Sequence, residues 1–169
     1  MSIQIFLLVF LIRIYQKKKI LENLLQIFLK LEVKTIIFPT YSFSFCKNEK
    51  FDYKKTITNM GILNEFVRKK YPNCRSLDPL LSNVLIGDNK FLIKKIGKQS
   101  IGVDSTFDLI HKSNLKTNFL FFGSNLHNCF TFMHYLEFIK KVNYRYMRKF
   151  TGYINHNSRN YKDTYELFV

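Results

Sequence analysis

A set of chemically reactive side chains recurs along one predicted helix in the last third of the chain. Thr131, His134, Glu137 and Lys141 are spaced three or four residues apart, so they share one face of a helix predicted for residues 128–142. A histidine can take up a proton near neutral pH, and a nearby carboxylate can orient its ring or stabilise its charged form. His134 and Glu137 are therefore candidates for general base catalysis. From spacing alone, an ordinary solvated pair on a helix surface is the more common role.

A second polar group lies just before a proline. Asp78 follows Arg75 and Ser76, and Pro79 biases it toward an extended conformation. Asp78 is a candidate ligand contact, and a turn-forming carboxylate beside a proline is the simpler interpretation. Arg75 has the right chemistry to bind a phosphate or to pair with Asp78, and the sequence does not separate these two roles.

Hydroxyl groups follow a predicted buried strand that Pro39 ends. Thr40, Tyr41 and Ser42 come directly after this strand, which is predicted for residues 33–38. Hydroxyls and backbone N–H groups in such a loop can bind a ligand or stabilise an oxyanion.

The elements that must position these groups alternate between helix and strand. Apolar residues at helical spacing predict helices at 19–31, 60–70, 104–111 and 128–142, and short apolar runs predict strands at 33–38, 83–86, 90–93 and 118–122. Asp104 or Ser105 would cap the third helix. A loop is expected at 40–57, and a turn at 123–125 is expected at the carboxyl edge of the sheet, where open α/β proteins bind ligands. This order predicts an α/β fold with a single domain and a central mixed sheet flanked by helices, a three-layer αβα sandwich.

Composition supports one packed domain and an anionic partner. The 169 residues are 47% hydrophobic and 17% aromatic, and 27 basic against 12 acidic side chains give a formal charge of +15. Such a charge raises the local concentration of anions, including nucleic acid, CoA and nucleotide-linked sugars. The basic residues are scattered in short groups and read mainly as solvated faces, and no RNA-binding signature accompanies them. No specific nucleic acid is therefore expected as a partner.

The cysteines, the histidines and the first residues argue against four features: a metal site, a disulfide framework, a membrane-spanning helix and a signal peptide. The three cysteines are widely separated and lack the spacing of a zinc site or a disulfide framework. The four histidines have no other metal-binding residues near them at a suitable spacing, so no metal is expected. The apolar run at residues 3–12 is too short to span a bilayer. Its basic residues follow it, the reverse of a signal peptide. A hydrophobic strand or helix, or an aberrant start, is expected there, in a cytoplasmic protein for which membrane association is not expected.

Several of these groups occur in an order that resembles the aminoglycoside N3-acetyltransferase family. The resemblance runs from about residue 21 to 153 and is carried by residues 38–46, 51–52, 60–63, 75–82, Val84, Gly87 and 131–137. Members of that family move an acetyl group from acetyl-CoA to an amine. The resemblance thus implies an acetyl-CoA-dependent N-acetyltransferase acting on an aminoglycoside, as in antibiotic resistance, or on a related amino sugar.

The resemblance also implies roles for individual residues. His134 would be the general base and Glu137 its orienting partner. Substrate-binding roles fall to Tyr41, Asp78 and Asp104, and acetyl-CoA-binding roles to Thr40, Ser42, Arg75 and Ser76. Backbone donors near Thr40 or Gly123 would hold the oxyanion.

The chain departs from the family in ways that leave alternatives open. Members are longer and carry an earlier strand and a Ser-rich loop that are not found here. We therefore expect residues 19–155 to form a partial acetyltransferase domain between an apolar and basic segment, 1–18, and a polar C-terminal tail, 156–169. Many antibiotic-modifying relatives have His or Asn where Asp78 stands, and the positive charge would repel a polycationic aminoglycoside. A surface-polysaccharide amino-sugar N-acyltransferase and an inactive truncated family member are the alternatives.

Overall fold

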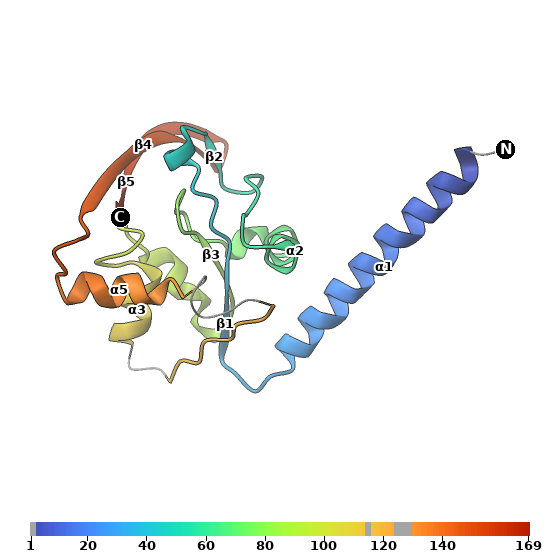
Figure 1. The fold of residues 1–169 in the computed structure, drawn as a ribbon, viewed down its shortest axis with the longest axis horizontal. Coiled ribbons are helices and arrows are strands. Elements are labelled where there is room, and N and C mark those ends of the chain that lie inside the picture. Colours follow the sequence, from blue (N-terminus) through green and yellow to red (C-terminus); the bar gives the residue numbers. More distant parts are fainter. Residues whose placement is uncertain (1–2, 114–115, 124–129) are drawn as a thin grey trace.

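The chain folds around a small sheet that has helices on both of its sides. The computed structural model describes residues 3–113, 116–123 and 130–169. Figure 1 shows α1 (Ile3–Leu29) and α2 (Ile62–Lys70) on one side of β1 (Thr35–Pro39) and β3 (Asn83–Gly87). The helices α3 (Thr106–Lys112) and α5 (Phe132–Ile139) lie on the other side. The predicted α/β class, with a single domain and helices flanking the strands, is confirmed.

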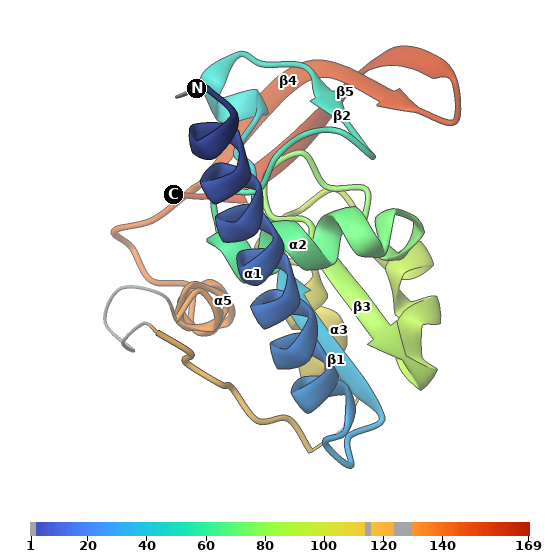
Figure 2. The same cartoon turned by 90° about the vertical axis from the view of Figure 1, so that its right-hand side faces the viewer.

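The first helix is longer than the sequence pattern indicated. Apolar spacing predicted a helix at 19–31, whereas α1 begins at Ile3 and ends at Leu29. Figure 2 shows it crossing in front of α2. Leu25 is fully buried and packs with Phe38, Val67 and Val84, so the C-terminal half of α1 is attached to the body. Across the described residues, no helix combines the length and apolarity that crossing a membrane requires.

The first sheet consists of β1 and β3, which pair antiparallel with Phe38 opposite Val84. Both strands and α2 match their predicted ranges within a few residues. Gly87 ends β3 with φ of 123°, and a Cβ there would lie 2.2 Å from the carbonyl oxygen of Lys34. Only glycine fits such a close approach of two strands.

The second sheet contains β2 (Phe51–Asp52), β4 (Met147–His156) and β5 (Arg159–Phe168). β2 is parallel to β4, and β4 and β5 form an antiparallel hairpin. The expectation of a polar tail at 156–169 is wrong, because Tyr165 and Leu167 alternate with polar residues and are buried in the core. Asn157 and Ser158 both have positive φ, the backbone of a tight hairpin turn.

Two other strand predictions are wrong. Residues 90–93 lie in a 3₁₀ segment, Asp88–Lys95, since the chain turns tightly directly after Gly87. Residues 118–122 form an irregular segment in which Leu120 and Phe122 are exposed. Phe119 and Phe121 contact Phe130, with the Phe119 and Phe130 centroids 5.0 Å apart, and Phe122 contacts Phe28 of α1.

Helix boundaries and loops account for the remaining differences. α5 is shorter than the predicted 128–142, whose first two residues lie outside the described part of the chain. Of the predicted turn at 123–125, only Gly123 is described. The loop predicted at 40–57 includes β2 and a 3₁₀ turn, Phe45–Lys47; a further 3₁₀ turn, Pro72–Cys74, follows α2. Ser105, and not Asp104, caps α3, because its hydroxyl accepts from the backbone N–H of Asp108.

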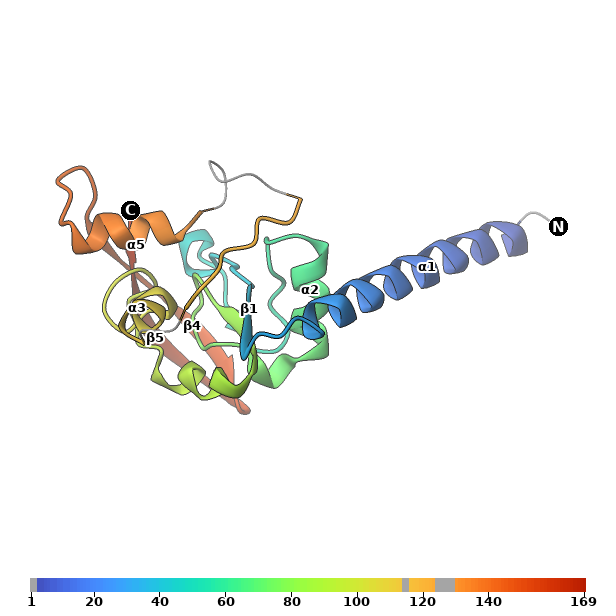
Figure 3. The ribbon, with the colours of Figure 1, turned by 90° about the horizontal axis from the view of Figure 1, so that it is seen from below.

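The main core lies between the second sheet, α3 and α5. It is rich in aromatic rings, and its fully or nearly fully buried members include Phe45, Phe51, Leu80, Tyr135 and Ile154. Figure 3 shows α3 and α5 side by side at one end of the molecule, with α1 extending from the opposite end. Tyr135 anchors α5 to this core, and α5 also carries the predicted catalytic pair, His134 and Glu137.

Candidate functional site

The predicted histidine and glutamate contact each other on α5. Nδ1 of His134 lies 2.8 Å from Oε2 of Glu137, and the side chains are 38% and 18% exposed, respectively. A pair at this spacing on an open helix surface contributes only about 0.2–0.5 kcal/mol, too little to hold two flexible side chains by itself. Additional contacts are therefore needed to fix the arrangement.

Those contacts come from the turn that joins α5 to β4. The Tyr144 hydroxyl donates to Oε1 of Glu137 at 3.0 Å, and Nε of Arg145 lies 2.8 Å from Oε2. The Arg145 N–H is not aligned for a hydrogen bond, so that contact is an ion pair. The hydrogen bond with His134, the one from Tyr144 and the charge of Arg145 lower the pKa of Glu137. The sequence analysis missed Tyr144 and Arg145.

This geometry assigns the ring proton of His134. An ionised carboxylate accepts hydrogen bonds and donates none, so the neutral ring carries its proton on Nδ1. Nε2 then holds the free lone pair. The arrangement can accept a proton at Nε2 while Glu137 compensates the charge that develops on the ring.

The loop after β1 reaches the first turn of α5. Tyr41 is 6% exposed, and its hydroxyl lies near enough to Thr131, three residues before His134, for Thr131 to influence its pKa. Burial raises the pKa of Tyr41. The structure thus places this predicted substrate-binding residue one helical turn from the predicted base.

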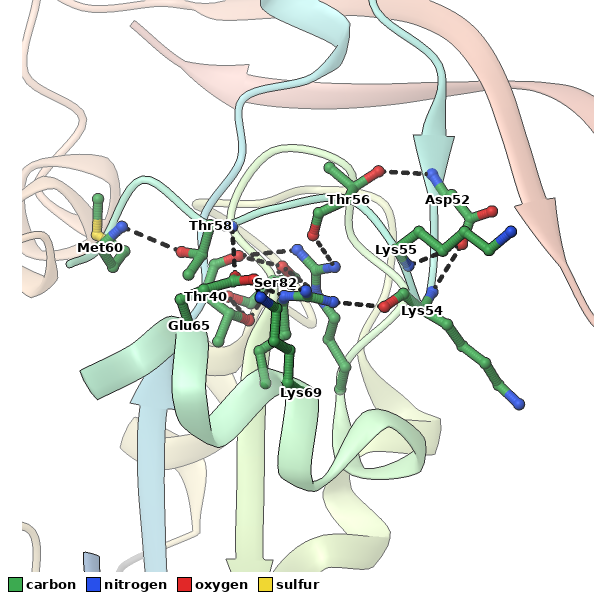
Figure 4. A network of polar contacts seen from close by, with 12 residues as sticks. Thr40, Asp52, Lys54, Lys55, Thr56, Thr58, Met60, Glu65, Lys69 and Ser82 are labelled. Atoms are coloured by element: carbon green, nitrogen blue, oxygen red, sulfur yellow. Dashed lines mark hydrogen bonds and ion pairs between the residues drawn. The ribbon is translucent and has the colours of Figure 1, made fainter. Parts of the chain in front are cut away.

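Arg75, predicted to bind the cofactor, is instead at the centre of a buried network. Its guanidinium is 0% exposed and donates to the carbonyls of Thr40 at 3.0 Å, Thr56 at 2.8 Å and Tyr53 at 3.3 Å. It also donates to the Ser82 hydroxyl at 3.0 Å. Figure 4 shows Thr40, Thr56 and Ser82 converging in this network. Burial lowers the pKa of Arg75 to about 10. In this arrangement Arg75 bridges loops of the protein, and none of its hydrogen bonds goes to Asp78.

The other residues predicted to bind the cofactor also have internal partners. The Thr40 hydroxyl donates to the Ser82 carbonyl at 3.0 Å, and the Ser42 hydroxyl donates to the Pro79 carbonyl at 3.1 Å. Their backbone N–H groups donate to Ser82 and Leu80. The Ser76 hydroxyl accepts from the N–H of Asn83 at 2.8 Å. The structure brings these residues together, but as an interlocked set of buried turns.

Asp78 adopts the turn-forming role. It is 2% exposed, and its Oδ1 accepts from the N–H groups of Leu80 and Leu81 at 2.8 and 3.0 Å and from the Ser100 hydroxyl at 2.9 Å. Burial raises the pKa of Asp78.

Asp104 is exposed and has a left-handed backbone. Its N–H donates to Asp108 at 2.7 Å, and Asp108 accepts from the Tyr135 hydroxyl of α5 at 2.8 Å. Asp104 is thus joined to α5 through Asp108, a residue that the sequence analysis did not single out.

The surface of the described residues includes two open cavities. One, of about 460 Å³, is lined by Ser42 and by three lysines, Lys47, Lys50 and Lys55, together with Glu49, Asp52, Thr56, Ile57 and Asn59. The other, of about 870 Å³, lies at the hairpin tip around His156 and Arg159. Neither is lined by His134. Among the described residues, no three His, Cys, Asp or Glu side chains are grouped closely enough to hold a metal ion.

Comparison with known proteins is consistent with this fold. A family model described as aminoglycoside 3-N-acetyltransferase matches residues 32–168. The crystal structure of the YokD protein from Bacillus subtilis superposes with a TM-score of 0.63 at 18% identity, over 80% of this chain and 61% of that chain. This chain therefore spans less than two thirds of that relative, and the likeness is one of fold. No curated protein sequence matches significantly.

Proposed function

Because this chain belongs to the aminoglycoside 3-N-acetyltransferase family, we propose that it transfers an acetyl group from acetyl-CoA to an amine of an aminoglycoside or related amino sugar. The observation that carries the proposal is the His134–Glu137 pair, with Nδ1 and Oε2 2.8 Å apart and the ring partly exposed. The family match covers both residues.

The proposed reaction is a single displacement. The amine nitrogen attacks the thioester carbonyl while Nε2 of His134 accepts its proton. The nitrogen–carbon bond forms, the carbon–sulfur bond breaks, and CoA leaves as the thiolate. Glu137 stabilises the imidazolium until the proton passes to the thiolate or to water. The amine must attack in its neutral form, because a protonated amine has no lone pair, and the proton that passes to His134 during the attack is the one whose loss leaves an uncharged amide.

The lysine-lined cavity supports an anionic donor. Within the described part of the chain, Lys47, Lys50 and Lys55 form no ion pair with a carboxylate. Asp52, in the same wall, already accepts from the N–H groups of Lys54 and Lys55 and from the Asn155 amide. The three amines outnumber the two carboxylates of the lining, Glu49 and Asp52, by one charge, so the cavity keeps a positive balance that suits the phosphates of CoA.

The test is thiol release from acetyl-CoA by the purified full chain with a panel of amines. We expect release with at least one aminoglycoside or amino sugar, and saturable binding of CoA. Release with none of the amines, together with no CoA binding, would contradict the proposal and leave an inactive family member.

A further inference from the structure

A tight backbone reversal ends α5. Lys141 has a left-handed φ of 52°, the N–H of Val142 donates to the carbonyl of Glu137 at 3.3 Å, and the N–H of Lys141 donates to that of Phe138 at 3.1 Å. These are the two hydrogen bonds of a Schellman motif. The chain consequently turns back at Lys141, and the residues that follow return toward Glu137.

The reversal brings the next residues onto both oxygens of one carboxylate. Tyr144 donates to Oε1 at 3.0 Å, and Arg145 lies 2.8 Å from Oε2, the oxygen that also contacts Nδ1 of His134. Tyr144 is 67% exposed, so its hydroxyl is not held at this position by burial. The direct contact with Glu137 fixes its hydroxyl.

We propose that Tyr144 and Arg145 are positioning residues, which hold the Glu137 carboxylate in the orientation that keeps the proton of His134 on Nδ1 and leaves Nε2 free. The catalytic consequence rests on the proposed function, whereas the position of the ring proton does not.

The physical reason lies in the geometry of a carboxylate. A glutamate side chain has several rotatable bonds, and a single contact at one oxygen leaves the group free to rotate. Contacts at both oxygens define its plane and aim one oxygen at Nδ1. Arg145 also places a fixed charge beside the carboxylate, which keeps it ionised and therefore an acceptor only.

The test is nitrogen-15 NMR of the full chain, with the His134 ring signals assigned by their loss in His134→Gln. In the wild-type protein the neutral ring should be protonated on Nδ1. Tyr144→Phe, which removes a single exposed hydroxyl, and Arg145→Gln should each increase the population protonated on Nε2.

Matched controls lie in the same segment. Tyr146→Phe removes an equally exposed hydroxyl, and Arg148→Gln removes an equal charge; neither side chain contacts Glu137 in the structure described here, and both variants should keep the wild-type spectrum. A wild-type ring protonated on Nε2, or spectra of Tyr144→Phe and Arg145→Gln that match these controls, would overturn the proposal.

Kinetics give a second readout. Arg145→Gln should lower kcat about tenfold or more with little change in KM for the donor, since a catalytic group displaced by about 1 Å can cost about 100-fold in rate. An unchanged kcat would contradict the positioning role. If the wild-type chain releases no thiol but the spectra behave as expected, the proposed function fails and the assignment of Tyr144 and Arg145 stands.

Discussion

Gly152 of β4 lies directly against the ring of Phe45, where an added Cβ would be 2.6 Å from two ring carbons. Phe45 is 2% exposed and cannot move aside freely. We expect Gly152→Ala to lower the free energy of unfolding by about 1–3 kcal/mol, through overpacking. Urea denaturation measures this. Phe45→Leu should relieve the clash, so the double variant should lose less stability than the sum of the single losses. Additive losses would argue against direct contact.

His134→Gln should lower kcat/KM for acetyl transfer by about 10²–10⁴-fold, the range expected when a general base is lost. His111→Gln is the matched control, since His111 is exposed on α3 and should be replaceable without loss. Thiol release under identical conditions gives both values. Equal activities of the two variants would remove His134 from the mechanism.

Replacing Lys47, Lys50 and Lys55 together by Gln should raise KM for acetyl-CoA at least about threefold, with kcat unchanged. Each exposed charge contact contributes about 0.2–1 kcal/mol, and three contacts add up. Added salt screens these charges, so the difference in KM for acetyl-CoA between the triple variant and the wild type should become smaller as the salt concentration rises. Lys162→Gln serves as the control, since Lys162 is an exposed residue of β5. Unchanged KM in the triple variant would place the donor elsewhere.

Asp78→Asn should stabilise the protein near pH 7. Burial raises the pKa of Asp78 above its value in the unfolded chain, so the ionised carboxylate costs stability at pH values above the folded-state pKa. The amide oxygen can still accept from Leu80, Leu81 and Ser100. The advantage of the variant should shrink as the pH falls through that pKa, where the wild-type carboxyl becomes neutral.

The companion change, Asp78→Ala, should instead cost about 2–6 kcal/mol, because it leaves two buried N–H groups unpaired at about 1–3 kcal/mol each. Urea denaturation over a pH series tests both variants. A stability gain for Asp78→Asn that grows toward low pH would contradict the assigned sign.

Arg75→Met should destabilise the fold by about 3 kcal/mol or more. It leaves the carbonyls of Tyr53 and Thr56 without their donor, at about 1–3 kcal/mol for each unpaired buried acceptor, and it leaves the Thr40 carbonyl with the Ser82 hydroxyl alone. Arg75→Lys should restore little of the lost stability, since a single ammonium cannot reach all the acceptors that surround the planar guanidinium. Arg159→Met at the exposed hairpin tip is the control. Normal stability with lost CoA binding in Arg75→Met would restore the predicted cofactor role.

The sequence predicted correctly those features that depend on residues close together in the chain. The His134–Glu137 contact follows from helical spacing, the end of β1 follows from Pro39, and the start of α3 follows from the capping hydroxyl of Ser105. Each depends on neighbours within a few residues. The α/β class was predictable for the same reason.

Contacts between distant segments were not predictable in this way. Arg75 is satisfied by backbone carbonyls, which every residue possesses and which leave no mark in a sequence. Tyr144 and Arg145 reach Glu137 because Lys141 adopts a left-handed conformation that glycine usually signals, and no glycine stands there. The strand β5 alternates apolar and polar residues, but its many charged and polar side chains resemble a tail.

Tyr146 and Val169 exchange a pair of backbone hydrogen bonds of 3.0 Å each, one residue after Arg145. Val169, the residue directly after β5, therefore anchors the segment that joins α5 to β4 and carries Arg145, although it lies far along the chain from α5. A stop codon or frameshift just before Val169 would leave every proposed active-site side chain encoded while loosening the backbone that presents one of them. When gene variants of this protein are interpreted, an intact catalytic motif is thus insufficient grounds for assuming an active enzyme.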